Sequence, residues 1–255
     1  MKNIFLFLFL FIISGSAFAG LPENDLFLQD KDAHFNNTIT EEDFIESMNE
    51  VIEVYSPIIN KLGGKLIIQG DWEDSTVNAW TKKDGKDWVV QMFGGLARRK
   101  EITKDAFKLV ICHEIAHHIG GYPTSGWASI EGQADYVTTF VCAKKLFANT
   151  KDIDNNYERC NVYESKKDAN ICSRTLEAGQ SLANLLSAIS FNKIPNYSTP
   201  DKTEVKKTSG AHPKAQCRLD TFLAGAICKK EWNDRTIPKN AEATCDNRPK
   251  CWFYK

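Results

Sequence analysis

The stretch ICHEIAHHIGG, residues 111–121, holds three of the five histidines of this 255-residue chain in an otherwise apolar setting. At about 100° per residue, His113 and His117 lie about 40° apart on a helix and one turn (~6 Å) along its axis. Two imidazoles on one face at that separation can bind one metal ion, and Glu114 flanks that face. In this His-Glu-x-x-His pattern the histidines hold zinc and the glutamate acts on the attacking water, so the stretch predicts a zinc site.

The surroundings favour a helix at this position. Thr103 can cap a helix over residues 104–119, and Gly120-Gly121 can end it. A chance match of the motif is expected in on the order of 1% of chains of this length. His118 points about 100° away from His117, which is more typical of a hydrogen-bonded structural histidine, so we assign it no role.

A catalytic zinc site needs a third protein ligand. The nearest acidic candidates lie in SIEGQADYVTTF (129–140), where Glu131 and Asp135 are spaced i, i+4 on one face of a predicted helix. The connection over residues 120–128 is short enough to fold this helix back against the first. Glu131 could then reach the metal, and Asp135 could accept the other ring N–H of a liganding histidine. The alternative is a solvated acidic pair on an ordinary helix.

The rest of the chain predicts a single α+β domain. Thr40 can cap a helix that runs to Gly63-Gly64, and residues 65–69 form a short strand candidate. Residues 76–81 and 88–93 read as a hairpin around Asp84-Gly85. Further helices are expected over residues 129–148, 170–191 and 213–229, and a cysteine-containing tail follows over residues 230–255.

Residues 1–19 have the three-part layout of a secretory signal, with Ala17-Phe18-Ala19 before the predicted cut. The domain that carries the predicted zinc site would then span residues 20–229. The chain has 32 basic and 33 acidic residues, and the leader holds only Lys2, so the mature net charge is −2. We therefore expect no nucleic-acid partner and, after the leader is removed, no membrane span. The oligomeric state stays open.

Eight cysteines lie outside the leader and none forms Cys-x-x-Cys. An even count in an exported chain predicts up to four disulfide bonds, in a periplasmic or secreted protein. The two close pairs, Cys160–Cys172 and Cys245–Cys251, are the expected bonds, and Cys112 is a disulfide or core candidate because it points about 100° from His113.

Several motifs resemble those of the gluzincin metallopeptidases, in particular the family of the CAAX prenyl endopeptidases and HtpX-like peptidases. HEIAH (113–117) followed by EGQAD (131–135) is similar to its zinc helix and its E-x-x-A-D helix. VNAW (77–80) with the next strand resembles its substrate-pairing edge, and AHPKAQCR (211–218) resembles its His-Pro motif. The resemblance covers about a third of the chain, and the short spacing between His117 and Glu131 is also similar to that of the ImmA-like peptidases.

The resemblance implies a zincin-like fold, in which a small antiparallel sheet with an edge strand packs on a buried zinc-binding helix. The zinc ligands that it implies are His113, His117 and Glu131. Glu114 would be the catalytic base and Asp135 a support for a liganding histidine. His212 and Arg218 would lie near the active site, where His212 is suited to stabilise a developing oxyanion. A surface turn at the start of a helix is the alternative for His212.

Together these patterns predict a zinc-dependent endopeptidase that hydrolyses extended protein or peptide substrates, with Zn²⁺ as its cofactor. The substrate would add one strand to the edge near residues 88–93. The alternative is a non-catalytic zinc-held binding or chaperone-like module in an exported compartment, which would be expected to lose Glu114. A disulfide-stabilised structural protein without metal would leave the histidine cluster unexplained.

Overall fold

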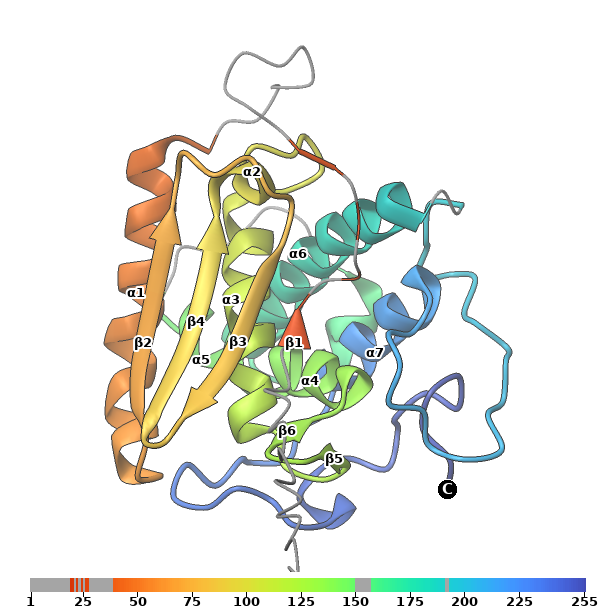
Figure 1. Cartoon of the computed structure of the whole chain (residues 1–255). Helices are drawn as coiled ribbons and strands as arrows, with labels where there is room; N and C mark the ends of the chain where they lie inside the picture. The colour runs from red at the N-terminus through yellow and green to blue at the C-terminus, as the bar shows by residue number, and fades with distance from the viewer. Residues whose placement is uncertain are drawn as a thin grey trace, which may run out of the picture.

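The computed structural model describes residues 19–20, 22, 24, 26–27, 39–149, 157–190 and 193–255. The predicted leader therefore lies outside the described residues, apart from Ala19. The described residues form an α+β fold in which a small sheet is covered on one face by helices (Figure 1). Within these ranges, no helix combines the length and the apolar character that crossing a bilayer requires.

The sheet has the order β1-β3-β4-β2. The hairpin predicted from the sequence forms: β3 (Ala79–Asp84) pairs antiparallel with β4 (Asp87–Phe93), and Gly85 takes a φ of 57° in the turn. β2 (Lys65–Asp71) pairs parallel with β4, so the prediction of an antiparallel sheet is wrong for this pair. The two-residue strand β1 (Ala19–Gly20) pairs antiparallel with β3.

The predicted edge strand near residues 88–93 is wrong, because β4 is the central strand of the sheet. Its residues Trp88, Val89, Val90 and Met92 are all buried, and a nearly continuous buried run is typical of a central strand. On the side away from β2, β4 is followed by β3 and then by β1, whose two residues cover only part of the edge of β3. Any strand added to this side of the sheet must therefore pair with β3.

Helices α1 (Glu41–Lys61) and α3 (Lys104–Ile119) pack against one face of the sheet, as Figure 1 shows. Thr40 and Asp43 form a capping box at the start of α1, with the Thr40 hydroxyl accepting from the Asp43 N–H at 3.2 Å. The short helix α2 (Gly94–Ala97) connects the sheet to α3. Phe44 of α1 and Phe107 of α3 meet in the core, with ring centroids 5.2 Å apart.

The remaining helices pack on α3 or on one another. The predicted helix over residues 129–148 forms in three joined pieces: α4 (Glu131–Val137), a π-helical turn (Thr138–Cys142) and α5 (Ala143–Phe147). The long helix α6 (Lys166–Ser190) and the helix α7 (Ala215–Ala226) follow. A Cβ on Gly225 would meet Tyr136 O and Thr139 Oγ1 at 2.3 Å, so glycine lets α7 approach the π turn closely.

A small hairpin and two 3₁₀ turns are the other elements of the described residues. Strands β5 (Thr124–Ser125) and β6 (Ala128–Ser129) form a small hairpin between α3 and α4. Two 3₁₀ turns lie at Glu158–Val162 and Ala241–Ala243.

Four disulfide bonds tie the helices and the C-terminal tail together, which fits an exported protein. The predicted Cys160–Cys172 bond is confirmed, and Cys112 is bonded to Cys142. The predicted Cys245–Cys251 bond is wrong: these two cysteines bond to Cys228 and Cys217, respectively.

The reason for the different pairing lies in the tail itself. Trp252 is fully buried, and its indole N–H donates to Thr221 Oγ1 of α7 at 3.0 Å. The neighbouring Cys251 is therefore held beside Cys217 on the same helix. The tail is anchored on α7 rather than closed on itself.

Candidate metal centre

Helix α3 places three histidines in the interior. Every residue from Ala106 to Ile119 is buried, so polar groups on this helix need partners or a counter-charge inside the protein. The Thr103 hydroxyl accepts from the Ala106 N–H at 3.2 Å and starts the helix, and Gly121 leaves it with a φ of 66°. The helix bounds are those that the sequence predicted.

His113 and His117 turn their Nε2 atoms toward the same point. These atoms lie 3.1 Å apart. The Nδ1–H of His117 donates to the Ser129 carbonyl oxygen at 2.7 Å, which leaves the lone pair on Nε2. Since two lone pairs cannot face each other stably at this distance, the pair needs a proton or a cation between them.

Glu131, the first residue of α4, brings a carboxylate to the same point. Its Oε2 lies 3.2 Å from His113 Nε2, and its Oε1 lies 3.7 Å from His117 Nε2. The chain returns to α3 through the β5–β6 hairpin, and the Ile130 N–H donates to the Pro123 carbonyl at 3.0 Å. His113, His117 and Glu131 are therefore close enough to hold one metal ion.

Asp135 and Arg218 contact the three candidate metal ligands through His113 Nδ1, the ring nitrogen that faces away from His117 and Glu131. Asp135 Oδ1 lies 3.0 Å from His113 Nδ1, close enough to accept the ring N–H. The Arg218 guanidinium donates to both carboxylate oxygens of Asp135, at 2.6 and 2.8 Å. Burial alone would raise the pKa of Asp135, but Arg218 and His113 hold it below its ordinary value. Asp135 is thus a fixed anion that can orient His113.

The charges of the group act on the two histidines in opposite directions. Burial lowers the pKa of His113, but the carboxylates of Asp135 and Glu131 outweigh it and raise this pKa to about 9. Burial and the nearby His113 lower the pKa of His117 to about 4. The pKa of Glu131 is lowered in spite of burial, because His113 lies beside it. The pocket therefore favours positive charge near His113 and Glu131.

Glu114 lies next to His113 on α3 and is fully buried. Among the described residues, neither of its carboxylate oxygens has a hydrogen-bond partner. Burial raises the pKa of Glu114 to about 8. A buried carboxyl group without a partner is costly in a structural role, so this one is available to a group that enters the site.

His212 lies at the surface of the same group. Its side chain is 37% exposed, and its Nε2 lies 3.3 Å from Glu131 Oε1. The same nitrogen donates to the Gly20 carbonyl oxygen at 2.7 Å. The structure therefore brings all seven residues singled out from the sequence into one neighbourhood, with His212 on its outer side.

His118 points away from this centre. Its Nε2 lies 2.7 Å from Thr81 Oγ1, and its ring stacks between Trp88 and Trp127. Burial lowers the pKa of His118 to about 3, so the ring is neutral. The His118 side chain therefore packs between α3 and the sheet.

Two contributions to the centre carried no signal in the sequence. Ser129 contributes its backbone carbonyl to His117, and a backbone group is not revealed by residue type. Gly20 reaches His212 from 192 positions away in the chain. A second group of close donor atoms, Asp201 with Cys217 and Cys251, is not a metal site because the two sulfurs are bonded to each other.

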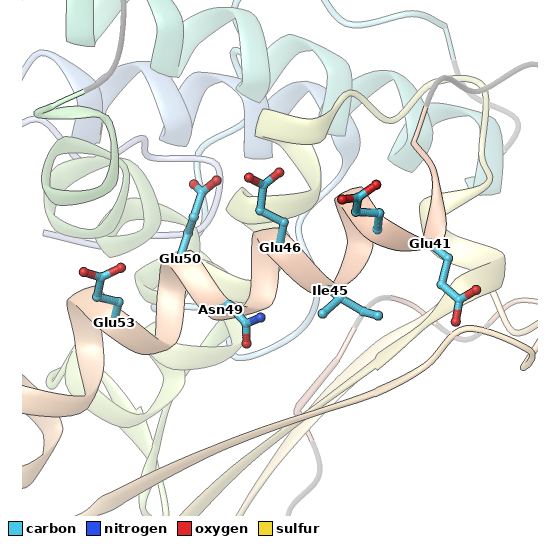
Figure 2. A pocket seen from close by; sticks show the side chains of 7 residues that line it. Glu41, Ile45, Glu46, Asn49, Glu50 and Glu53 are labelled. Atoms are coloured by element: carbon cyan, nitrogen blue, oxygen red, sulfur yellow. The ribbon is translucent and has the colours of Figure 1, made fainter.

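A surface hollow along α1 is lined by acidic side chains, as Figure 2 shows. Two of these are already paired, Glu46 with Lys104 and Glu50 with Lys108. Ile45 is the apolar residue in the hollow and is half-exposed. In contrast to the histidine centre, none of the described residues that line the hollow has a buried polar atom without a hydrogen-bond partner.

Comparison with known proteins adds no further assignment. No family model, no curated protein and no solved structure matches this chain. The candidate centre is therefore defined by its own geometry.

Proposed function

We propose that this chain is an exported zinc-dependent endopeptidase of the gluzincin type, with a zincin-like fold. The observation that carries the proposal is the convergence of His113 Nε2, His117 Nε2 and a Glu131 oxygen beside the carboxylate of Glu114, which has no hydrogen-bond partner within the described part of the chain. The donor types fit zinc, which takes two imidazoles and one carboxylate and keeps a fourth position open for catalysis. Bound there, zinc would supply a Lewis acid that activates water and polarises the scissile carbonyl.

The proposed roles of the side chains follow from their positions. Glu114 accepts a proton from the attacking water and passes it to the leaving amine, a role that suits a carboxyl group whose pKa burial raises to about 8. Asp135 fixes the ring of His113, and Arg218 fixes Asp135. The role that we propose for His212 is to donate a hydrogen bond to a developing oxyanion, and its half-exposed position beside Glu131 supports this role.

The second candidate function is a non-catalytic zinc-held binding or chaperone-like module. Metal binding of this kind needs His113, His117 and Glu131 but makes no use of Glu114. The burial of Glu114 without a partner favours catalysis, because a binding module gains nothing from this cost. We therefore rank the endopeptidase first.

The test is a Glu114→Gln variant of the full chain, assayed with casein as an unfolded substrate. We expect it to retain zinc while its rate of hydrolysis falls by about 10²- to 10⁴-fold, the usual contribution of a general base. Glu53→Gln, a change on the surface of α1, is the matched control and should behave like the parent. Casein hydrolysis by Glu114→Gln at the rate of the parent would exclude Glu114 as the base and favour the binding module.

A further inference from the structure

The outer edge of β3 is covered by the N-terminal residues of the same chain. Ala19 pairs with Thr81 and Gly20 with Trp80 in antiparallel register. Further along, the Leu26 carbonyl accepts from the Val77 N–H at 3.3 Å. We call the described residues from Gly20 to Phe27, which remain after the predicted cut, the N-terminal strap. Figure 1 shows strand β1 beside β3 and next to α3.

Two further contacts hold the strap along the edge. Asn24 Nδ2 donates to the Val77 carbonyl at 3.1 Å and to the Pro22 carbonyl at 3.0 Å. Phe27 forms an isolated antiparallel bridge with Thr76. The Phe27 side chain is 61% exposed, and Leu26 is only partly buried against the core, so backbone pairing and one apolar contact hold this end of the strap. A segment held in this way can be displaced by another strand.

The strap reaches the candidate metal centre through one carbonyl group. Gly20 O accepts from His212 Nε2 at 2.7 Å, and this nitrogen lies 3.3 Å from Glu131 Oε1. The strap is thus extended, antiparallel to the edge strand, and presents a backbone carbonyl beside the metal-binding carboxylate. A bound polypeptide substrate would need the same edge and the same neighbours.

Glycine is required at position 20 for this pairing. A Cβ on Gly20 would lie 2.4 Å from the Ala79 carbonyl oxygen, a distance that real side chains do not adopt. Since the opposing atom belongs to the backbone of β3, the strap rather than the sheet must move. Any side chain at position 20 should therefore loosen the strap.

We infer that the outer edge of β3 is a strand-binding surface and that the N-terminal strap is its resident occupant. The strap has to leave before another extended polypeptide can pair with β3. That this polypeptide is a substrate rests on the proposed function, whereas the occupancy of the edge does not. The strap covers a sheet edge that would otherwise be exposed, until a competing strand displaces it.

The test compares Gly20→Ala with Gly210→Ala in the full chain. Gly210 is the matched control, because a Cβ there meets nothing closer than Ile130 Cγ2 at 3.8 Å. The probe is a synthetic peptide with the sequence of residues 20–27, labelled at its C-terminus and followed by fluorescence anisotropy. An edge that is open one tenth of the time binds its ligand about tenfold more weakly than an open edge. We therefore expect Gly20→Ala to bind the peptide about tenfold more tightly than the parent and Gly210→Ala to match the parent.

Hydrogen exchange gives a second readout that does not depend on catalysis. The Val77 amide, which donates to Leu26 O, should exchange about tenfold faster in Gly20→Ala than in the parent. Equal peptide affinity of parent and Gly20→Ala, or unchanged exchange at Val77, would overturn the inference.

Casein hydrolysis separates this inference from the proposed function. With an active parent, Gly20→Ala should hydrolyse casein faster, and an unchanged rate would show that the strap does not block the substrate edge. With parent and variant both inactive, tighter binding of the peptide by Gly20→Ala would still support the strap, while the endopeptidase proposal would fail.

Discussion

Replacing Asp135 with Asn tests how the candidate centre is held. Asp135 is fully buried, lies 3.0 Å from His113 Nδ1, and accepts two hydrogen bonds from Arg218. Asparagine has almost the same shape but no charge, and its amide presents one acceptor oxygen instead of two. The change therefore leaves the packing in place while removing the anion that orients His113 and balances Arg218.

Two effects of different size follow from this geometry. Loss of a group that orients a liganding histidine lowers metal affinity by about 10- to 100-fold, which corresponds to about 1.4 to 2.8 kcal/mol. Loss of one partner from a buried ion pair lowers the free energy of unfolding by about 3–5 kcal/mol, because Arg218 remains charged in the interior. The change should therefore lower the free energy of unfolding by more than it lowers the free energy of zinc binding.

The assay is competition for zinc with a chromophoric chelator, after circular dichroism has shown that each variant is folded. Urea unfolding measures the free energy of unfolding on the same samples. Asp220→Asn is the matched control: Asp220 also lies on the inner side of α7, but it accepts from the Asp201 N–H at 2.7 Å and from Gln216 at 2.9 Å. A zinc affinity of Asp135→Asn within about twofold of the parent, or an equal loss in Asp220→Asn, would refute the reasoning.

Three further predictions concern the metal and the tail. Zinc at 100 times its dissociation constant should raise the free energy of unfolding by about 2.7 kcal/mol, and a chelator should abolish the gain in a thermal melt. Zinc affinity should rise as the pH increases from about 7 to 9, because His113, whose pKa is raised to about 9, must lose its proton before it can bind the ion; calorimetry at several pH values measures this, and a flat profile would contradict it. Trp252→Ala should lower the free energy of unfolding, measured in urea, by about 3–5 kcal/mol, because Trp252 is fully buried and hydrogen-bonded to Thr221. Tyr254→Ala, at the exposed end of the tail, should lower it much less.

The parts of the centre that lie close together in the sequence could be predicted well. Thr103 caps the start of α3, and the glycines after Ile119 end it. His113 and His117 therefore lie on the same helix, and their spacing puts them on one face. The return of Glu131 followed from a short connection, because a short connection leaves two helices few ways to pack. These features depend on local rules, which a single sequence contains.

The parts that depend on distant contacts could not be predicted in the same way. The hairpin of β3 and β4 was visible, but the parallel pairing of β2 with β4 depends on which side of β4 the strand β2 takes, and the local pattern does not determine this. The same holds for Cys251, whose partner is set by the burial of Trp252 against α7. For Arg218 the resemblance to a family suggested the neighbourhood, and only the structure shows the contact with Asp135 across 83 positions.

The charges buried around α3 explain why this centre suits a divalent ion. Three carboxylates, those of Glu114, Glu131 and Asp135, face one guanidinium, that of Arg218, so that neutral imidazoles would leave two negative charges uncompensated. Burying two uncompensated negative charges costs a large amount of free energy. Without an ion, protons supply the balance, since the pKa of His113 is raised to about 9 and that of Glu114 to about 8. A bound Zn²⁺ would bring the same two positive charges and release both groups, His113 to bind the ion and Glu114 to act as a base. The same electrostatic excess that would destabilise a purely structural cluster is thus what a metal-dependent hydrolase requires.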